Sequence, residues 1–136
     1  MHDSPNDLFT QVQWVCGQLL LEKSTLEMFS DEAVTFLNDL SKSIRNDRSL
    51  NKFTDLKTFS FWCRAANVNK IKSSYTNRKN IVGRGIALHI TPSNVAMNFA
   101  YSLAFGLLAG NLNIVRLPSK DFVQVELLIN KINALL

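Results

Sequence analysis

The sequence predicts an α/β fold, with a helical N-terminal region at residues 1–80 and the first strand–helix–strand–helix of a parallel sheet at residues 81–136. Three observations in one stretch support this prediction. Short apolar runs at Ile86–Ile90 and Ile114–Leu117 have the length of strands, and the nearly uncharged segment Val95–Ala109 between them has the length of a helix. Two strands joined through a helix are expected to lie parallel, with a right-handed crossover.

Three helices are expected in the N-terminal region. The first would begin at Ser4–Asp7, where Ser4 can cap and Pro5 fits the first helical position, and apolar residues follow at helical spacing: Leu8, Val12, Val15 and Leu19. The second would begin at Ser30–Glu32, with two acids in its first turn. The third would cover about Leu50–Ala66, and the polar, basic segment Asn67–Asn80 is then expected to be a connecting loop.

A last helix is expected after Lys120, with Ser119 or Asp121 as its cap. Its apolar side would be formed by Phe122, Val125, Leu128, Ile129 and Ile132. Parallel strands are usually covered on both faces, and a two-strand sheet leaves an edge open. We therefore expect an incomplete sheet, in a chain that stops in the middle of a domain.

The formal net charge of +4 is unevenly distributed along the chain. Residues 1–41 carry seven acids and one Lys, whereas residues 42–84 carry eleven Lys or Arg and two Asp. The basic middle is either a solvated helix face with a loop or a surface that attracts a polyanion, such as a nucleotide phosphate or coenzyme A. Binding to nucleic acids or to membrane surfaces is disfavoured. No series of aromatic residues alternates with the cations, and no known nucleic-acid-binding motif occurs.

Two cysteines, Cys16 and Cys63, form neither a disulfide framework nor a metal motif, and both are expected to be buried helical residues. His89 is expected to be a satisfied core or edge residue of its strand. The N-terminus lacks the features of a signal peptide, and the longest apolar stretch is too short to span a bilayer. We therefore expect a cytoplasmic protein with reduced thiols and no membrane span.

Polar residues follow each predicted strand, where open α/β sheets bind ligands. Asn94 stands after the first strand and has two readings: its oxygen can cap the helix, or its NH₂ group can bind an oxyanion that develops on a carbonyl. Arg116, Ser119 and Lys120 stand at the end of the second strand. They suit a phosphate group or, equally, are surface charges beside a helix cap.

The stretch from Gly83 to about Lys120 resembles the start of the cofactor-binding domain of the aldehyde dehydrogenase superfamily. Within that superfamily, it is most similar to the luminescence-type (LuxC-like) acyl-CoA reductase family. The matching segments are Pro92-Ser93-Asn94-Val95, Asn98-Phe99-Ala100-Tyr101-Ser102, Gly106-Leu107-Leu108-Ala109-Gly110-Asn111 and Asn113-Ile114-Val115-Arg116. This resemblance implies a Rossmann-like sheet and NADPH-dependent reduction of a fatty acyl group, carried as a thioester on a cysteine, to an aldehyde.

The resemblance also implies roles for individual residues. Asn94 matches the asparagine that helps to hold the oxyanion, and Thr91, Pro92 and Ser93 match the segment that passes along the cofactor. Arg116 matches a position near the adenosine ribose. Ser119 matches a position that often carries a Glu in NAD-preferring members. Since Ser119, Arg116 and Lys120 would accept a 2′-phosphate that a Glu would repel, we expect NADP(H) as the cofactor.

One departure from the family bears on activity. Family members are several hundred residues long, and their nucleophilic cysteine matches neither Cys16 nor Cys63. We therefore expect an N-terminal fragment of the reductase that cannot form the acyl-enzyme by itself. The alternative is a non-catalytic fragment that binds at most a nucleotide or a partner. The substrate implied is a fatty acyl-CoA or acyl-protein, with acyl-transferase and synthetase partners by family and a homo-oligomer as one option.

Overall fold

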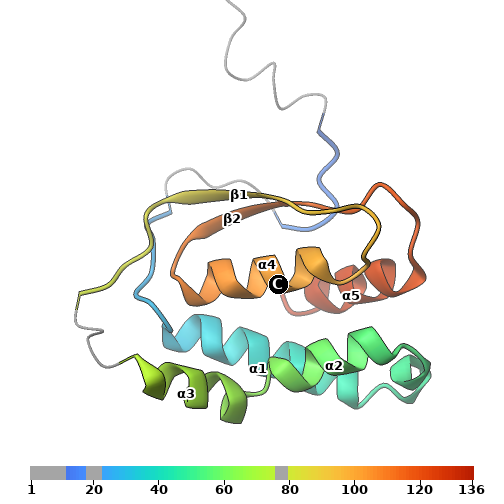
Figure 1. The fold of residues 1–136 in the computed structure, drawn as a ribbon, viewed down its shortest axis with the longest axis horizontal. Coiled ribbons are helices and arrows are strands. Elements are labelled where there is room, and N and C mark those ends of the chain that lie inside the picture. The colour runs from blue at the N-terminus through green and yellow to red at the C-terminus, as the bar shows by residue number, and fades with distance from the viewer. Residues whose placement is uncertain (1–11, 18–22, 76–79) are drawn as a thin grey trace, which may run out of the picture.

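The computed structural model describes residues 12–17, 23–75 and 80–136. These residues form five α-helices, one 3₁₀-helix and a two-stranded sheet (Figure 1). In chain order the elements are α1 (Asp31–Arg45), η2 (Arg48–Lys52), α2 (Thr54–Trp62), α3 (Ala65–Ser74), β1 (Ile86–Ile90), α4 (Asn98–Leu108), β2 (Leu112–Arg116) and α5 (Val123–Asn133). The predicted fold class is confirmed, and the small sheet is consistent with an incomplete α/β fold.

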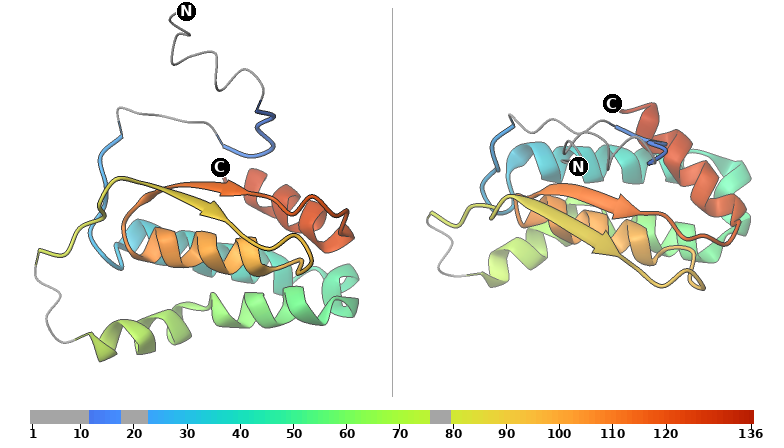
Figure 2. Two further views of the ribbon diagram at one scale, coloured as in Figure 1. Left: turned by 45° about the horizontal axis from the view of Figure 1, so that its top comes forward. Right: turned by 90° about the horizontal axis from the view of Figure 1, so that it is seen from above.

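The two strands lie side by side and parallel, as predicted, and α4 connects them (Figure 2). Their register pairs Ile86 with Leu112 and Ile90 with Arg116. The sheet forms one layer of the molecule, α4 lies directly against it, and α1, α2 and α3 lie on the far side of α4 (Figure 1). This arrangement places the ends of both strands at the same edge of the sheet.

The sheet carries helices on one face only within the described part of the chain. Ala87 and His89 are half-buried on the face toward α4, whereas Ile86, Leu88 and Ile90 alternate with them and are 48%, 63% and 68% exposed. The expectation that both faces would be covered is therefore wrong for the described residues. The alternation follows from the two-residue period of a strand, which sends successive side chains to opposite faces.

The N-terminal helices and the strand–helix–strand–helix unit contribute to one hydrophobic core. Its largest fully buried apolar side chains come from α1, α2, α4 and α5: Leu37, Leu40, Leu56, Phe59, Phe99 and Leu128. The segment before α1 also runs beside the approach to β1, since Met28 N donates to the Ile81 carbonyl at 2.9 Å. Burial of these side chains holds α4, and with it the sheet, against α1 and α2. The division into two domains near residue 80 stays a prediction.

The helix predicted to begin at Ser30–Glu32 is confirmed as α1. Ser30 is its N-cap and accepts a hydrogen bond from the Ala33 N–H at 3.3 Å, while Asp31 and Glu32 provide negative charge in the first turn. The predicted helix at Val95–Ala109 is also confirmed, although α4 begins three residues later, at Asn98.

The predictions around the third helix are wrong in two respects. The single helix expected at Leu50–Ala66 is three elements, η2, α2 and α3, and the loop expected at Asn67–Asn80 is helical as far as Ser74. The chain breaks at Arg64, whose backbone is extended, and α3 then begins. Two contacts stabilise α3: Val68 is fully buried, and the Asn38 side chain of α1 accepts a hydrogen bond from the Ala65 N–H at 3.0 Å.

Both terminal predictions also need correction. The start expected at Ser4–Asp7 lies outside the described residues, but Val12–Gly17 is not helical, and the Val15 carbonyl accepts a hydrogen bond from Asn133 of α5 at 3.1 Å. The last helix forms as expected, but its N-cap is Phe122 and no side chain caps it. Neither Ser119 nor Asp121 is the cap.

Candidate functional site

Two turns follow the strands at the same edge of the sheet, and we call them the strand-end turns: Thr91–Asn94 after β1 and Leu117–Lys120 after β2, together with Arg116, the last residue of β2. The pairing of Ile90 with Arg116 brings the turns together. A hydrogen bond then joins them, because the Ser119 N–H donates to Ser93 Oγ at 3.3 Å. The structure therefore brings together residues that are 26 positions apart in the chain.

Asn94 lies in the first strand-end turn with an exposed side chain. The N-cap of α4 is Met97, three residues further on, so the interpretation of Asn94 as the helix cap is wrong. Ala96 and Met97 are buried and fix the chain between the turn and the helix. The Asn94 amide has no hydrogen-bond partner among the described residues, and both of its N–H groups are free to donate.

Thr91 begins the same turn and contributes a hydroxyl group to it. Its Oγ1 atom is buried and has no hydrogen-bond partner in the described part of the chain. Such an atom is unusual, because a buried polar group without a partner costs about 1–3 kcal/mol. Pro92, by contrast, is exposed, and Ser93 already accepts the hydrogen bond from Ser119.

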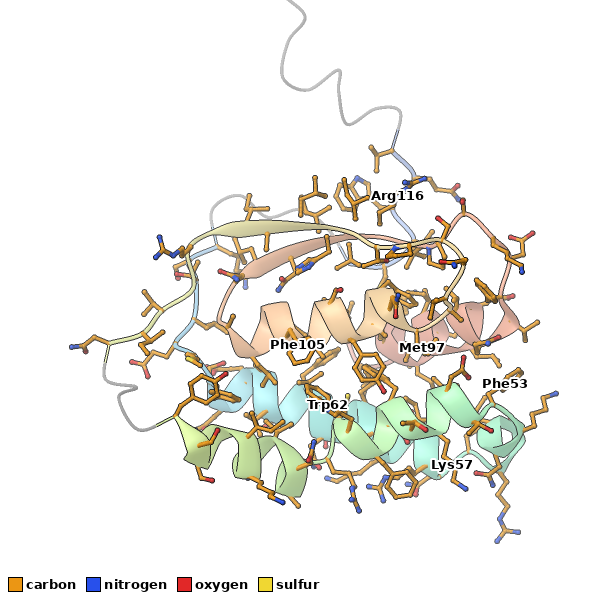
Figure 3. All side chains as sticks on the ribbon, in the orientation of Figure 1. Phe53, Lys57, Trp62, Met97, Phe105 and Arg116 are labelled. Carbon is orange, nitrogen blue, oxygen red and sulfur yellow. The ribbon has the colours of Figure 1, made fainter. Side chains whose placement is uncertain are left out.

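Two cations belong to the second strand-end turn. Arg116, Ser119 and Lys120 are all exposed, and Arg116 lies on the side of the sheet away from the helices (Figure 3). The Lys120 ammonium stands 5.3 Å from the centre of the Phe122 ring, a cation–π contact. Neither cation forms a salt bridge with a carboxylate of the described residues. The turns therefore offer positive charge, a hydroxyl and a free amide on one edge of the sheet.

Comparison with known families shows which family the chain belongs to. Residues 22–135 match the model of the acyl-CoA reductase (LuxC) family. The chain belongs to the LuxC acyl-CoA reductase family. No match was found among curated proteins or among solved structures. The resemblance to the LuxC-like acyl-CoA reductase family, predicted from the motifs at residues 83–120, is confirmed, and the match also includes the N-terminal helices.

A polar network lies between α4 and the sheet of this LuxC-family chain. His89 Nε2 faces Asn113 Oδ1 at 2.9 Å, and the Asn113 side-chain NH₂ donates to the Asn111 carbonyl at 2.7 Å. Because Oδ1 can only accept, His89 Nε2 carries a hydrogen. The prediction that His89 is a satisfied residue of its strand is confirmed.

Gly106 of α4 makes room for this network. A Cβ atom there would overlap with Asn113 Oδ1 and would lie 2.9 Å from His89 Nε2. The helix can approach the two strands this closely only because position 106 has no side chain. Sequence reasoning included Gly106 among the family motifs but did not find its partners, because the strand register that brings Asn113 and His89 beneath it is a tertiary feature.

The two cysteines of this LuxC-family chain do not contribute to the strand-end turns. Cys63 follows α2, is fully buried, and has its pKa raised by burial to about 12. Cys16 is half-buried in the segment before α1, and burial raises its pKa as well. A thiol with a raised pKa is a weak nucleophile near neutral pH. The expectation of burial is confirmed for Cys63, but the segment that holds Cys16 is not a helix.

Metal binding and membrane insertion find no support in the described residues. These residues contain no group of three or more His, Cys, Asp or Glu side chains that could hold a metal ion. None of their helices combines the length and apolar character that crossing a bilayer requires.

Proposed function

We propose that this chain supplies the NADP(H)-binding turns and the oxyanion-binding amide of a reductase that converts a fatty acyl thioester into an aldehyde. The family membership supports acyl-CoA reductase activity in general. The observation that carries the finer proposal is the junction of the strand-end turns, where Asn94 has a free amide and Ser93 is hydrogen-bonded to Ser119.

Asn94 is the residue that we assign to the reacting carbonyl. When a carbonyl carbon becomes tetrahedral, negative charge develops on its oxygen, and a fixed N–H donor stabilises that charge more than it stabilises the ground state. The Asn94 side chain is exposed and has no hydrogen-bond partner among the described residues, and its turn leads directly into the buried residues Ala96 and Met97. Its role would be to donate a hydrogen bond to the oxyanion.

The second strand-end turn suits a cofactor that carries a 2′-phosphate. Arg116 and Lys120 would provide positive charge, and Ser119 would provide a hydroxyl where a carboxylate would repel the phosphate. Thr91, Pro92 and Ser93 would lie along the cofactor. When bound, NADPH supplies the hydride of the reduction.

We assign the acyl-accepting cysteine to neither Cys16 nor Cys63. The Cys63 thiol is fully buried with a pKa of about 12, so it would not form a thiolate at neutral pH. We therefore expect these residues to act together with a nucleophile that the 136 residues do not supply. Acyl-transferase or synthetase partners, self-association and a cytoplasmic location stay predictions.

The cofactor assignment is tested by Ser119→Glu. NADPH binding to the purified chain would be followed by the fluorescence of the nicotinamide, with NADH as the paired ligand. A carboxylate at position 119 should weaken NADPH binding by about tenfold and leave NADH binding unchanged, because it repels only the 2′-phosphate. Asn69→Glu, a substitution on the exposed side of α3, is the control for net charge. Equal weakening by both substitutions would remove the assignment.

The role of Asn94 is tested in the assembled reductase by Asn94→Ala. Loss of one oxyanion donor is expected to lower kcat by about 10²–10³-fold with little change in the KM for the acyl substrate. Asn69→Ala is the matched control, because it removes an exposed amide far from the strand-end turns in the sequence. A normal kcat for Asn94→Ala would exclude the oxyanion role.

The second candidate is a non-catalytic module that binds a nucleotide or a partner. The observation that favours it is that neither cysteine belongs to the strand-end turns and that burial raises the pKa of both thiols. The two proposals differ in one measurement, the release of aldehyde from fatty acyl-CoA and NADPH. Turnover that disappears with Asn94→Ala supports the reductase, whereas binding of NADPH without any turnover in the presence of a cysteine-bearing partner supports the module.

A further inference from the structure

A second polar region lies on the helical side of the molecule, in a pocket between α1, η2 and α2 that we call the α1–α2 pocket. Its volume is about 210 Å³. Ile44 and Leu50 contribute apolar surface, and Arg45 and Lys57 bring two positive charges to its lining. Figure 3 shows Arg116 at the sheet and Lys57 on the helical side of the molecule, so this pocket is separate from the strand-end turns.

The Arg45 guanidinium is held in place at this pocket. Its Nε donates to Ser41 Oγ at 3.2 Å, and the Ser41 hydroxyl donates to the Ser60 carbonyl of α2 at 2.6 Å. Ser41 and Ser60 are both fully buried. A buried hydroxyl in a helix contact costs free energy unless it is hydrogen-bonded, and here the hydrogen bonds fix an arginine that leaves its two terminal NH₂ groups available.

Carboxylates do not neutralise the cations of the α1–α2 pocket. Residues 42–75 contain eight Lys or Arg and only two acids, Asp47 and Asp55. Asp47 is paired with Lys131 at 2.8 Å, and Asp55 accepts hydrogen bonds from the Leu56 N–H and the Gln124 side chain. Arg45 and Lys57 consequently have no carboxylate partner among the described residues.

Phe61, which lines this pocket, contacts a further cation, Arg64. Its ring is 41% exposed and lies 4.9 Å from the Arg64 guanidinium and 6.0 Å from that of Arg45. Two guanidinium groups therefore contact one aromatic ring, each through a cation–π interaction. A planar arginine head presents paired donors that match phosphate oxygens.

We propose that the α1–α2 pocket binds a phosphate group, with Arg45 and Lys57 as its ligands and Arg64 nearby. The preformed pocket and the anchored arginine favour this over a merely solvated basic face, the other interpretation of the basic middle of the sequence. The proposal does not depend on the reductase function, because none of these residues belongs to the strand-end turns. The phosphate could be free or part of a nucleotide.

The test uses the purified chain, with inorganic phosphate, pyrophosphate and ADP as probes at constant ionic strength. Binding would be followed by ¹H–¹⁵N NMR, with the amides of Asn51, Ser60 and Phe61 as reporters. We expect saturable shifts of these amides. Tighter binding of ADP than of pyrophosphate would identify a nucleotide as the ligand, and equal binding would identify a free phosphate.

Lys57→Gln is the principal variant, because Lys57 is exposed and its loss should not disturb folding; Arg45→Lys is the second. Each should weaken pyrophosphate binding by about tenfold or more, since a charge-assisted hydrogen bond is lost. Lys70→Gln, on the exposed part of α3, should have no effect, and Ser119→Glu should change only cofactor binding. Absence of saturation up to about 10 mM probe, or equal weakening by Lys70→Gln, would overturn the proposal.

Discussion

Gly106→Ala is the substitution that tests how closely α4 packs against the sheet. The added Cβ would overlap with Asn113 Oδ1 and would lie 2.7 Å from Asn113 Cγ and 2.9 Å from His89 Nε2. Relief requires either a shift of α4 away from the strands or rotation of the Asn113 side chain. Rotation would break the hydrogen bonds of Asn113 to His89 and to the Asn111 carbonyl.

Opposing contributions set the expected loss of stability for Gly106→Ala. Overpacking costs about 1–3 kcal/mol, and each lost hydrogen bond costs about 1 kcal/mol. The exchange of Gly for Ala in a helix returns about 1 kcal/mol. We therefore expect the free energy of unfolding to fall by about 2–4 kcal/mol, a large part of the stability of a small domain.

The assay for Gly106→Ala is urea unfolding followed by circular dichroism, in a double-mutant cycle with Asn113→Ala. Removing the Asn113 side chain makes room for the new methyl group, so the penalty should shrink by about 1 kcal/mol or more in that background. Ser102→Ala, on the same helix, controls for helix propensity. An unchanged or increased stability of Gly106→Ala would refute the close approach of α4 to the sheet.

Two further predictions concern titratable groups. Cys63, with its pKa of about 12, should resist iodoacetamide at pH 8 until the chain unfolds, whereas the half-buried Cys16 should react first; mass spectrometry of timed samples distinguishes them, and early labelling of Cys63 would contradict its burial. The hydrogen bond from Lys131, followed by that from Ser49, lowers the pKa of Asp47 to about 2. Since the unfolded value is about 3.9, the stability that Asp47 contributes is present above that pH and is lost as pH falls toward 2. Thermal unfolding should therefore show a smaller loss of stability between pH 5 and 2 for Asp47→Asn than for the unaltered chain; equal losses would exclude the pairing.

Local sequence patterns determined the order of elements around the site. The runs at Ile86–Ile90 and Ile114–Leu117 and the uncharged segment between them predicted strand, helix and strand, and all three form, although β2 spans Leu112–Arg116. Ser30 with its acids predicted the start of α1. These features depend on side-chain periodicity and capping within a few residues, which a sequence displays directly. The nearness of the strand-end turns also followed, because parallel topology places the ends of both strands at one edge.

Other features depended on contacts between distant segments. The polar segment after Asn67 is helical because Val68 enters the core and Asn38 of α1 caps Ala65. The helix predicted to begin at Val95 begins at Asn98 instead, and its N-cap is Met97. The Asn94 amide is therefore not used as a cap and has no hydrogen-bond partner among the described residues. Neither outcome can be obtained from propensity within a window, since the partner that decides it lies elsewhere in the chain or in the packing of the core.

The family motifs and the positive charge of residues 42–84 can be read from the sequence by itself. The position of the charged side chains on the surface cannot. Only the packing of α1 on α2 places Arg45 and Lys57 at one pocket, through buried serines that are 19 residues apart. The same holds for Gly106, which the motif includes but whose need for a missing side chain appears only when β1 and β2 bring His89 and Asn113 against α4. Sequence determines what each segment can form by itself, and close packing determines which side chains meet.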